Sequence, residues 1–381
     1  MNTHIEPEPP GTPYPTTICT SNQRANGSRT SRRGRLRPDN EHSQLPSRLN
    51  QVPVVVLYSQ SQPLLRGDPM DILSDEETAW VAGKIAQSLK RYTSEVHLVP
   101  VQDDLDRVLS SFNPSRHLIF NMCESLGGRS CTEAKAAKRI AAHGFVFTGA
   151  MPETIEITMD KIRTKRMLIK HCLPTPVFQV IQKINGKSLN VPLPAIVKPS
   201  VESGSMGITQ QSLAQNPTDI WKRIETCLLN YKQPVLVENY IPGREINVSI
   251  WGADKPEILP LYEIDFQWTT DPLQRIVSFE SKWVVDSVEY IGTPGICPAH
   301  LSERDSQTVR EVAMSAYLML GIRSYARIDI RLHEGVPYIL EVNTNPDLAP
   351  NAGFYGSAKA AGYSYPQMVR KITELALDSQ S

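Results

Sequence analysis

Near the C-terminal end of the chain, charged and amide side chains recur at every second position of two adjacent segments. Residues 325–331 and 337–345 each place their polar side chains two apart, which is typical of β-strands with one polar face. The short stretch His-Glu-Gly between them predicts a hairpin. The polar side chains that this pattern brings to one face are Arg327, Asp329, Glu341 and Asn343.

The length of the hairpin loop predicts which residues face each other. A three-residue loop that places Gly335 in a left-handed conformation would pair Asp329 with Ile339 and Arg327 with Glu341. Opposed residues of antiparallel strands point to the same face. We therefore expect Ile339 to share a face with Glu341, and the two carboxylates to lie close together.

This polar face has the composition of a metal site. Two carboxylates and an amide oxygen on one patch repel each other unless a cation lies between them. Mg²⁺ prefers such hard oxygen ligands, with room left for water and phosphate, and Mn²⁺ accepts a similar set. The sequence thus favours a site made of Asp329, Glu341 and Asn343. The alternative is an edge hairpin whose charged face is solvated.

Composition places the chain among globular proteins. Its 381 residues suggest two or three domains, and a hydrophobic fraction of 40% suffices for real cores. A formal net charge of zero argues against general attraction to nucleic acid or to membranes. The six cysteines show no metal-ligand or redox spacing, and neither a membrane span nor a signal peptide is recognisable. We therefore expect a cytoplasmic protein with reduced thiols.

The first fifty residues differ from the rest. Residues 1–50 are rich in Pro, Ser, Thr, Asn and Arg and nearly lack large aliphatic side chains, which predicts a disordered tail. Five arginines between positions 29 and 37 form a small basic cluster. This cluster is either a tether for an anionic partner or part of a solvated tail, and the second interpretation is favoured.

Residues 51–150 alternate between strands and helices, which predicts an open α/β domain with a parallel sheet. A capping box at Ser74-Asp-Glu-Glu77 predicts the start of its first helix. Ligands of such sheets meet the carboxyl ends of the strands. The loop that follows one of these strands makes Glu124, Gly128 and Arg129 candidate substrate contacts. An ordinary glycine turn with incidental charges is the alternative.

Two further segments suit a nucleotide. A helix predicted over 151–175 carries a run of lysines and arginines, which is usually a solvated face. A later strand ends in Lys198 and is followed by a loop rich in serine and glycine, residues 200–207, that can approach phosphate oxygens through backbone N–H groups. It is not a Walker loop, because the lysine precedes the glycines.

The next segments suggest a base-binding hinge and a lid. The strand over 234–241 runs into a Pro-Gly turn whose backbone can face an adenine edge, and Glu245 lies just beyond it. Residues 268–296 show no clear period and hold Lys282, which is typical of a mobile lid. Helices are predicted over 308–320 and 365–377.

Taken in order, these motifs resemble the ATP-grasp superfamily, and specifically its D-alanine–D-alanine ligase branch. The resemblance covers roughly residues 53–378. It implies an α/β (α+β) ATP-grasp fold with an N-terminal open parallel α/β domain (51–150), a central ATP-grasp subdomain (151–240) and a C-terminal one with the magnesium site (241–381). The motifs that carry it are Met159–Lys165, Ile196–Ser200, Ser203–Gly207, Val237–Tyr240, Gly243–Glu245, Ala326–Asp329 and Leu340–Asn343.

The resemblance also implies roles for single residues. Catalytic roles fall to Arg327, at the acyl carbon, to Lys282, on the mobile loop, and to Ser205. Two Mg²⁺ ions would be held by Asp329, Glu341 and Asn343. The residues implied in ATP binding are Lys161, Lys198, Ser205, Met206, Gly207, Glu238, Tyr240 and Glu245.

The implied reaction joins a carboxylate to an amine. ATP phosphorylates the carboxylate, and the amine then displaces phosphate from the acyl phosphate through a tetrahedral oxyanion. Such chemistry needs charge neutralisation and alignment more than a covalent catalyst. The expected partners are small amino-acid or carboxylate substrates, with neither nucleic acid nor membrane, and a homodimer is common among the resembled proteins.

Two departures bear on the substrate. The glycine-rich turn with a glutamate after the first strand is replaced by residues 58–63, and the segment after Asn343 reads Thr-Asn-Pro-Asp-Leu in place of Thr-Ser-Pro-Gly-Met. Both regions, together with Asn345, touch the amino-acid substrates in the resembled family. The leading interpretation is therefore a ligase for another amino acid or metabolite, followed by a true D-alanine–D-alanine ligase. An inactive nucleotide-binding protein recruited by its basic tail is the alternative from another class.

Overall fold

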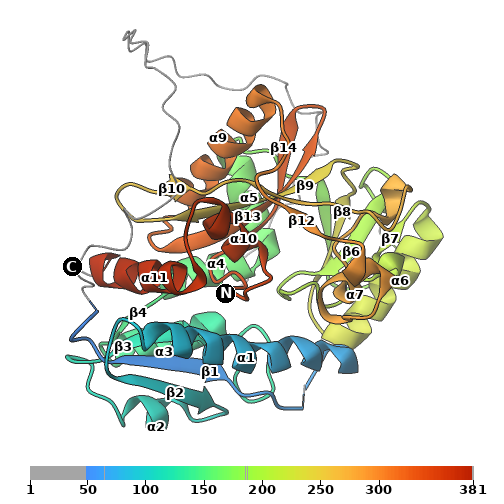
Figure 1. Ribbon diagram of the computed structural model, residues 1–381. Helices are drawn as coiled ribbons and strands as arrows, with labels where there is room; N and C mark the ends of the chain where they lie inside the picture. Colours follow the sequence, from blue (N-terminus) through green and yellow to red (C-terminus); the bar gives the residue numbers. More distant parts are fainter. Residues whose placement is uncertain (1–48, 64, 185, 187, 380–381) are drawn as a thin grey trace, which may run out of the picture. The chain divides into compact units, whose positions relative to one another are not determined.

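The computed structural model describes residues 49–63, 65–184, 186 and 188–379 (Figure 1). The expected tail therefore lies almost wholly outside the described residues. Leu49, assigned to that tail, is fully buried in a core cluster. The described elements form three β-sheets with helices packed on them. No helix within these described ranges is both long and apolar enough to cross a bilayer.

The first sheet is parallel, as expected, with strand order β2-β1-β3-β4. One face packs on α1 and the C-terminal helix α11, and the other packs on α2 and α3. Burial on both faces explains the continuous apolar run of β1. The elements are β1 (Val54–Ser59), η1 (Pro69–Asp71), α1 (Ile72–Leu89), β2 (Val96–Val101), α2 (Leu105–Leu109), β3 (Leu118–Met122), α3 (Glu133–Ala142) and β4 (Val146–Phe147).

The predicted start of the first helix was wrong. Helix α1 begins at Ile72, so the expected capping box at Ser74–Glu77 lies inside the helix. The capping box is formed earlier, because the Asp68 side chain accepts from Met70 N and the Asp71 side chain accepts from Asp68 N.

The second sheet is antiparallel, with order β5-β8-β6-β7. The single helix predicted before it is two helices, because Asp160 leaves the helical conformation and caps the second one with its side chain. Both of these helices pack against β14 of the third sheet. The elements are α4 (Pro152–Met159), α5 (Lys161–Lys170), β5 (Phe178–Ile181), β6 (Ala195–Pro199), η2 (Gln210–Ser212), β7 (Leu213–Ala214), α6 (Pro217–Tyr231) and β8 (Val235–Asn239).

The third sheet has the order β12-β11-β9-β13-β14, with β10 paired to β9. Alternate residues of β9 and β13 pack in one hydrophobic cluster with α9, which leaves their polar residues on the other face. The elements are β9 (Arg244–Trp251), β10 (Glu257–Ile258), β11 (Tyr262–Ile264), η3 (Pro272–Gln274), α7 (Phe279–Trp283), α8 (Val288–Ile291), β12 (Gly295–Ile296), α9 (Glu303–Met319), β13 (Tyr325–His333), β14 (Val336–Asn343), α10 (Gly353–Ala360) and α11 (Tyr365–Ser379).

Candidate active site

A cavity of about 470 Å³ collects most of the residues that the sequence singled out. Its wall includes side chains from α1, from the loops after β3 and β6, and from the polar face of the third sheet. The predicted residues found in this wall are Glu124, Lys161, Lys198, Ser205, Met206, Glu238, Tyr240, Glu245, Lys282, Arg327, Asp329, Glu341, Asn343 and Asn345.

The β13–β14 hairpin places its carboxylates face to face, although the predicted register was wrong. Asp329 pairs with Glu341, and Arg327 pairs with Asn343. The turn has two residues, Glu334 and Gly335, with φ of 49° and 76°, which is the left-handed pair that a type I′ turn requires.

A bulge explains the remaining difference in register. The pairing shifts between Asp329 and Ile330, and Leu340 is the extra residue on β14. Ile339 therefore packs in the hydrophobic cluster, and does not share the face of Glu341 as expected. The two carboxylates still converge, because the observed partner of Asp329 is two residues from the predicted one and a shift of two keeps Glu341 on the face of Asp329.

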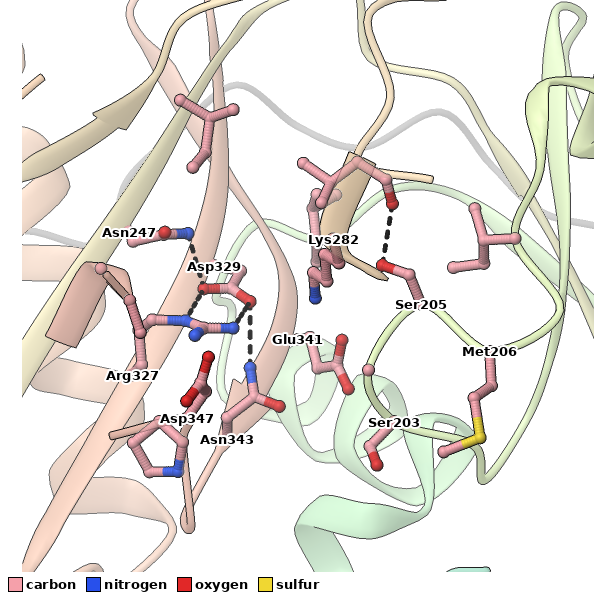
Figure 2. Close-up of a pocket in the computed structure, with 18 of the residues that line it drawn as sticks. Ser203, Ser205, Met206, Asn247, Lys282, Arg327, Asp329, Glu341, Asn343 and Asp347 are labelled. Atoms are coloured by element: carbon pink, nitrogen blue, oxygen red, sulfur yellow. Dashed lines mark hydrogen bonds and ion pairs between the residues drawn. The ribbon is translucent and has the colours of Figure 1, made fainter. Parts of the chain in front are cut away.

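Asp329 is held by three neighbouring side chains (Figure 2). Arg327 binds both of its oxygens, with Nε 2.7 Å from Oδ1 and Nη2 2.9 Å from Oδ2. Asn247 donates to Oδ1 at 2.8 Å, and Asn343 donates to Oδ2 at 3.0 Å. Because Asn343 uses its Nδ2 here, its Oδ1 stays available as a cation ligand.

Sequence reasoning missed Asn247. It lies on β9 directly opposite Asp329. The signal was present, since Asn247 stands two residues after Glu245 and therefore shares its face of the strand.

Glu341 is surrounded by cationic side chains. Lys161 Nζ lies 3.2 Å from Glu341 Oε1, and the same ammonium donates to the carbonyl oxygen of Glu202. Burial raises the pKa of Glu341, but Lys161, Lys198 and Lys282 lower it more, so the pKa falls below its ordinary value. Figure 2 shows the Lys282 ammonium pointing toward the hairpin carboxylates.

A buried carboxylate joins two lysines on the opposite wall. Glu238 pairs with Lys165, 2.8 Å away, and with Lys198. The side chains of Lys165 and Glu238 are 1% and 2% exposed. Lys165 is thus not part of a solvated helix face, contrary to the expectation for its charge run. Burial lowers the pKa of Lys165 to about 8.

The loop after β6 contacts the segment that carries Lys282. Ser205 has φ of 61°, and its hydroxyl donates to the carbonyl of Val277 at 2.8 Å. Trp283 Nε1 donates to the carbonyl of Gly204 at 2.7 Å. Gly207 lies outside the cavity wall. It packs against Pro199 and the Tyr231 ring so closely that a Cβ at this position would lie 2.8 Å from each. The expected lid is partly ordered, since it contains η3, α7 and α8.

Glu245 is paired with a residue that sequence reasoning did not single out. Arg331 Nη2 lies 2.7 Å from Glu245 Oε2, and its Nη1 donates to the carbonyl of Gly243 at 2.9 Å. The guanidinium also lies over the rings of Tyr240 and Phe266, 5.4 Å from each centroid. Arg331 therefore fixes both Glu245 and the aromatic side chains around it.

Two further carboxylates line the cavity, and Figure 2 shows one of them, Asp347, beside Arg327 and Asn343. Glu77 and Asp347 belong to its wall, as does Asn345, whose Oδ1 accepts from the Tyr325 hydroxyl at 3.0 Å. Burial, together with the charge of Asp347, raises the pKa of Glu77 to about 7.

Two predicted substrate contacts lie elsewhere. Gly128 and Arg129 belong to a turn outside the cavity wall, where a Cβ on Gly128 would collide with the carbonyl oxygen of Pro63. The loop therefore turns tightly there, and Glu124 is the residue that reaches the cavity from it.

Comparison with solved structures gives the fold class. The ATP complex of D-alanine–D-alanine ligase from Bacillus anthracis superposes with a TM-score of 0.67 at 19% identity, over 86% of this chain and 98% of that one. A second structure of that ligase gives a TM-score of 0.65. The fold is the ATP-grasp fold, as the ordered motifs predicted.

Sequence comparisons identify the family. The family model described as "D-ala D-ala ligase C-terminus" matches residues 173–374. A protein named D-alanine–D-alanine ligase from Actinobacillus succinogenes is 30% identical over 267 residues, 68% of this chain and 80% of that one. An uncharacterized protein of Sinorhizobium fredii, y4sG, is 28% identical over 309 residues, 78% and 88% of the two chains. This chain belongs to the D-alanine–D-alanine ligase family, whose members are ATP-dependent carbon–nitrogen ligases.

Proposed function

We propose that this protein joins a carboxylate to an amine through an ATP-derived acyl phosphate, with a substrate pair other than two D-alanines. The observation that carries the proposal is the pairing of Asp329 with Glu341 across the hairpin, within one cavity that also holds Lys161, Lys198 and Lys282. Carboxylates flanked by ammonium groups suit the outer phosphates of a nucleotide together with a cation.

The residues present fit magnesium. Asp329, Glu341 and the amide oxygen of Asn343 would hold two Mg²⁺ ions, or Mn²⁺ in their place, since these are hard oxygen donors on facing strands. The bound ions supply neutralisation of phosphate charge during transfer. Asn247 and Arg327 orient Asp329 from either side, which leaves little freedom in the ligand oxygens.

The protein's own side chains account for the remaining requirements. Lys161, which pairs with Glu341, and Lys198 would bind the phosphates, and the ion pair with Glu238 fixes the position of Lys198. The carboxylate oxygen attacks the γ-phosphorus and ADP leaves. The amine nitrogen then attacks the acyl carbon and phosphate leaves. Arg327 stands beside Asp329 with Nη1 outside their ion pair, where it can stabilise the tetrahedral oxyanion.

The substrate end of the cavity favours a partner other than D-alanine. Asp347 replaces the glycine of the usual motif and adds a carboxylate beside Arg327 and Asn343. The Asp347 carboxylate would repel the carboxylate of an amino acid bound beside it. The second candidate is D-alanyl-D-alanine formation, which the names of relatives such as those from Actinobacillus succinogenes and Desulforamulus reducens favour.

A substrate panel tests the function. ADP and phosphate release from ATP and Mg²⁺ is measured with D- and L-amino acids, basic ones included, and with small amines and carboxylates. We expect at least one pair to raise ADP release well above the ATP-only rate. E341Q should lower that rate by about 100-fold or more, since it removes a charged ligand. E334Q, on the exposed turn of the same hairpin, is the matched control and should leave the rate unchanged.

Each outcome of this panel has a clear meaning. Turnover with D-alanine alone would establish the second candidate. If no acid or amine raises ATP turnover above background, the ligase proposal fails and a nucleotide-binding protein takes its place.

A further inference from the structure

A second group of ligand-type side chains lies at the amino-terminal end of the first sheet. His97 Nε2 is 3.1 Å from Glu95 Oε1, and His117 Nε2 is 3.8 Å from the same oxygen. All three ligand atoms lie within 4.8 Å of one another. This end of the parallel sheet is opposite to the carboxyl ends of the strands, where Met122 and Glu124 line the cavity. The group is therefore separate from the proposed ligase site.

The backbone explains why these three side chains meet. Glu95 and His97 are two residues apart in extended chain, so they point to one face. The carbonyl of Glu95 accepts from Val54 N at 3.0 Å, and Leu118 N donates to the carbonyl of Pro53 at 2.9 Å. The start of β1 thus lies between the two chain segments, and the side chains of His97 and His117 approach each other across it, with ring centroids 6.1 Å apart.

The ligand atoms match the spacing of a zinc-type ion. With bonds of ~2.1 Å to nitrogen and oxygen, tetrahedral ligands stand about 3.4 Å apart. The two distances to the Glu95 oxygen, 3.1 and 3.8 Å, fall on either side of this value. Two imidazoles and one carboxylate are preferred by zinc and its transition-metal neighbours over magnesium.

The imidazoles are already oriented. His117 Nδ1 lies 2.9 Å from the backbone carbonyl oxygen of Asn113 and 3.2 Å from the backbone nitrogen of Asn113. In the tautomer whose Nδ1–H donates to this carbonyl, the Nε2 lone pair is directed at the group, as in most histidine ligands of metals, and a bound ion selects this tautomer. The Phe112 ring packs against both imidazoles, with centroid distances of 5.4 Å.

We propose that Glu95, His97 and His117 bind a divalent transition-metal ion of the zinc class. The side chains of Glu95 and His97 are 44% and 41% exposed, whereas that of His117 is 11% exposed, so the site opens to solvent on one side. Water supplies the fourth ligand there. The ion would link the first residues of β2 to the chain entering β3 and stabilise the sheet by binding the folded state alone.

One variant near the site is expected to raise metal affinity, whereas the ligand variants lower it. Arg116 is close enough to Glu95 to interact with its carboxylate electrostatically. A bound cation competes with this guanidinium, so R116Q is expected to strengthen metal binding several-fold, and loss of a ligand is expected to weaken it.

Calorimetric titration of the chelator-stripped full chain with ZnCl₂ tests the site, with Co²⁺ absorption as a second readout. We expect one ion per wild-type chain at this site, with affinity lowered about tenfold or more in H97Q and in H117Q. H143Q is the matched control, because His143 pairs with Asp106 in the same domain and is outside the group. All variants keep the N-terminal segment and the cavity unchanged, so any zinc bound at those places is the same in wild type and variants and does not affect the difference between them.

Thermal unfolding gives an independent check. Saturating zinc should raise the melting temperature of wild type and H143Q by about 5 °C and should leave the H97Q/H117Q double variant unchanged. Equal zinc binding by wild type and the double variant, or absence of the tetrahedral Co²⁺ bands from wild type, would overturn the proposal. Neither result depends on whether the chain has ligase activity.

Discussion

Asp329 accepts hydrogen bonds from four nitrogen atoms of three side chains, Arg327, Asn247 and Asn343. These four donors occupy both oxygens and fix the orientation of the carboxylate, so a cation at Asp329 would take the place of one of the donors. A cation ligand gains from such fixation, because the cost of ordering it is met during folding and not during binding.

Replacing Asn247 tests the importance of this fixation. N247L removes the donor to Asp329 Oδ1 while nearly keeping side-chain volume, and we expect the Mg²⁺ affinity to fall by about 10–100-fold. The measurement is the Mg²⁺ concentration dependence of ATP binding. An unchanged Mg²⁺ dependence in a folded N247L variant would show that Asn247 has no part in orienting the ligand.

Glu77 predicts a specific dependence of stability on pH. Its pKa is raised from 4.5 to about 7 in the folded protein, so between these values the folded state holds a proton that the unfolded state has released. Stability from this group is full below pH 4.5 and is lost as the pH rises through 7. E77Q lacks this loss, so its unfolding free energy relative to wild type should rise from pH 5 to pH 8.

Urea unfolding of E77Q and wild type at pH 5 and pH 8 measures the effect. Because the two proteins are compared at the same pH, the contributions of all other titrating groups to the unfolding free energy cancel. A difference between E77Q and wild type that stays constant with pH would contradict the raised pKa.

Several of these residues show where sequence patterns suffice. Alternation in the two strands predicted that Asp329 and Glu341 converge, but it also placed Ile339 on the face of Glu341, which was wrong. The bulge at Leu340 was not predictable from the period of a strand, because it interrupts the alternation. Lys165 and Arg331 were missed because their partners, Glu238 and Glu245, are far away in sequence.

At the scale of elements, helix α5 and strands β6 and β8 are joined by one buried carboxylate. Glu238 on β8 pairs with Lys165 of α5 and Lys198 of β6. Removing this carboxylate leaves two buried ammonium groups without their counter-charge, whereas removing Lys165 leaves Glu238 its second partner.

We therefore expect E238A to destabilise the protein by about 3–5 kcal/mol and K165M by clearly less. Equilibrium unfolding in urea measures both. Equal losses would show that the pair with Lys165, and not the shared carboxylate, dominates. K170M is the control, because Lys170 ends the same helix and is exposed.

The alternation of strands and helices predicted the parallel sheet correctly, and the polar alternation predicted the β13–β14 hairpin, but local boundaries depended on caps. The side chain of Asp160 divides the charged helix into α4 and α5, and the capping box of Asp68 and Asp71 precedes the expected one. Several residues compete as caps in both segments. Tertiary packing decides between them, and the sequence alone does not show that packing.

At the scale of the whole described chain, the C-terminal helix covers part of one face of the first sheet. Helix α11 packs against α1 and β4, and its apolar face, Met368, Val369 and Ile372, is fully buried. The last residues in sequence therefore cover the first strands (Figure 1).

Truncation after Gly362 should thus expose one face of the first sheet as well as delete a helix. We expect the shortened chain to aggregate or to melt at least about 10 °C lower, because several fully buried side chains are lost at roughly 1.5–3 kcal/mol each. Differential scanning fluorimetry and light scattering measure both effects. An unchanged melting temperature would contradict the assigned packing of α11.

Asp329 and Glu341 are proposed to hold a cation against the outer phosphates of ATP, and calorimetric titration with ATP measures whether they do. Wild type and the E334Q control should bind ATP at least about tenfold more tightly with Mg²⁺ than with chelator, and E341Q should lose this difference. Equal ATP affinity of wild type with and without Mg²⁺, or an undiminished Mg²⁺ effect in E341Q, would contradict the account.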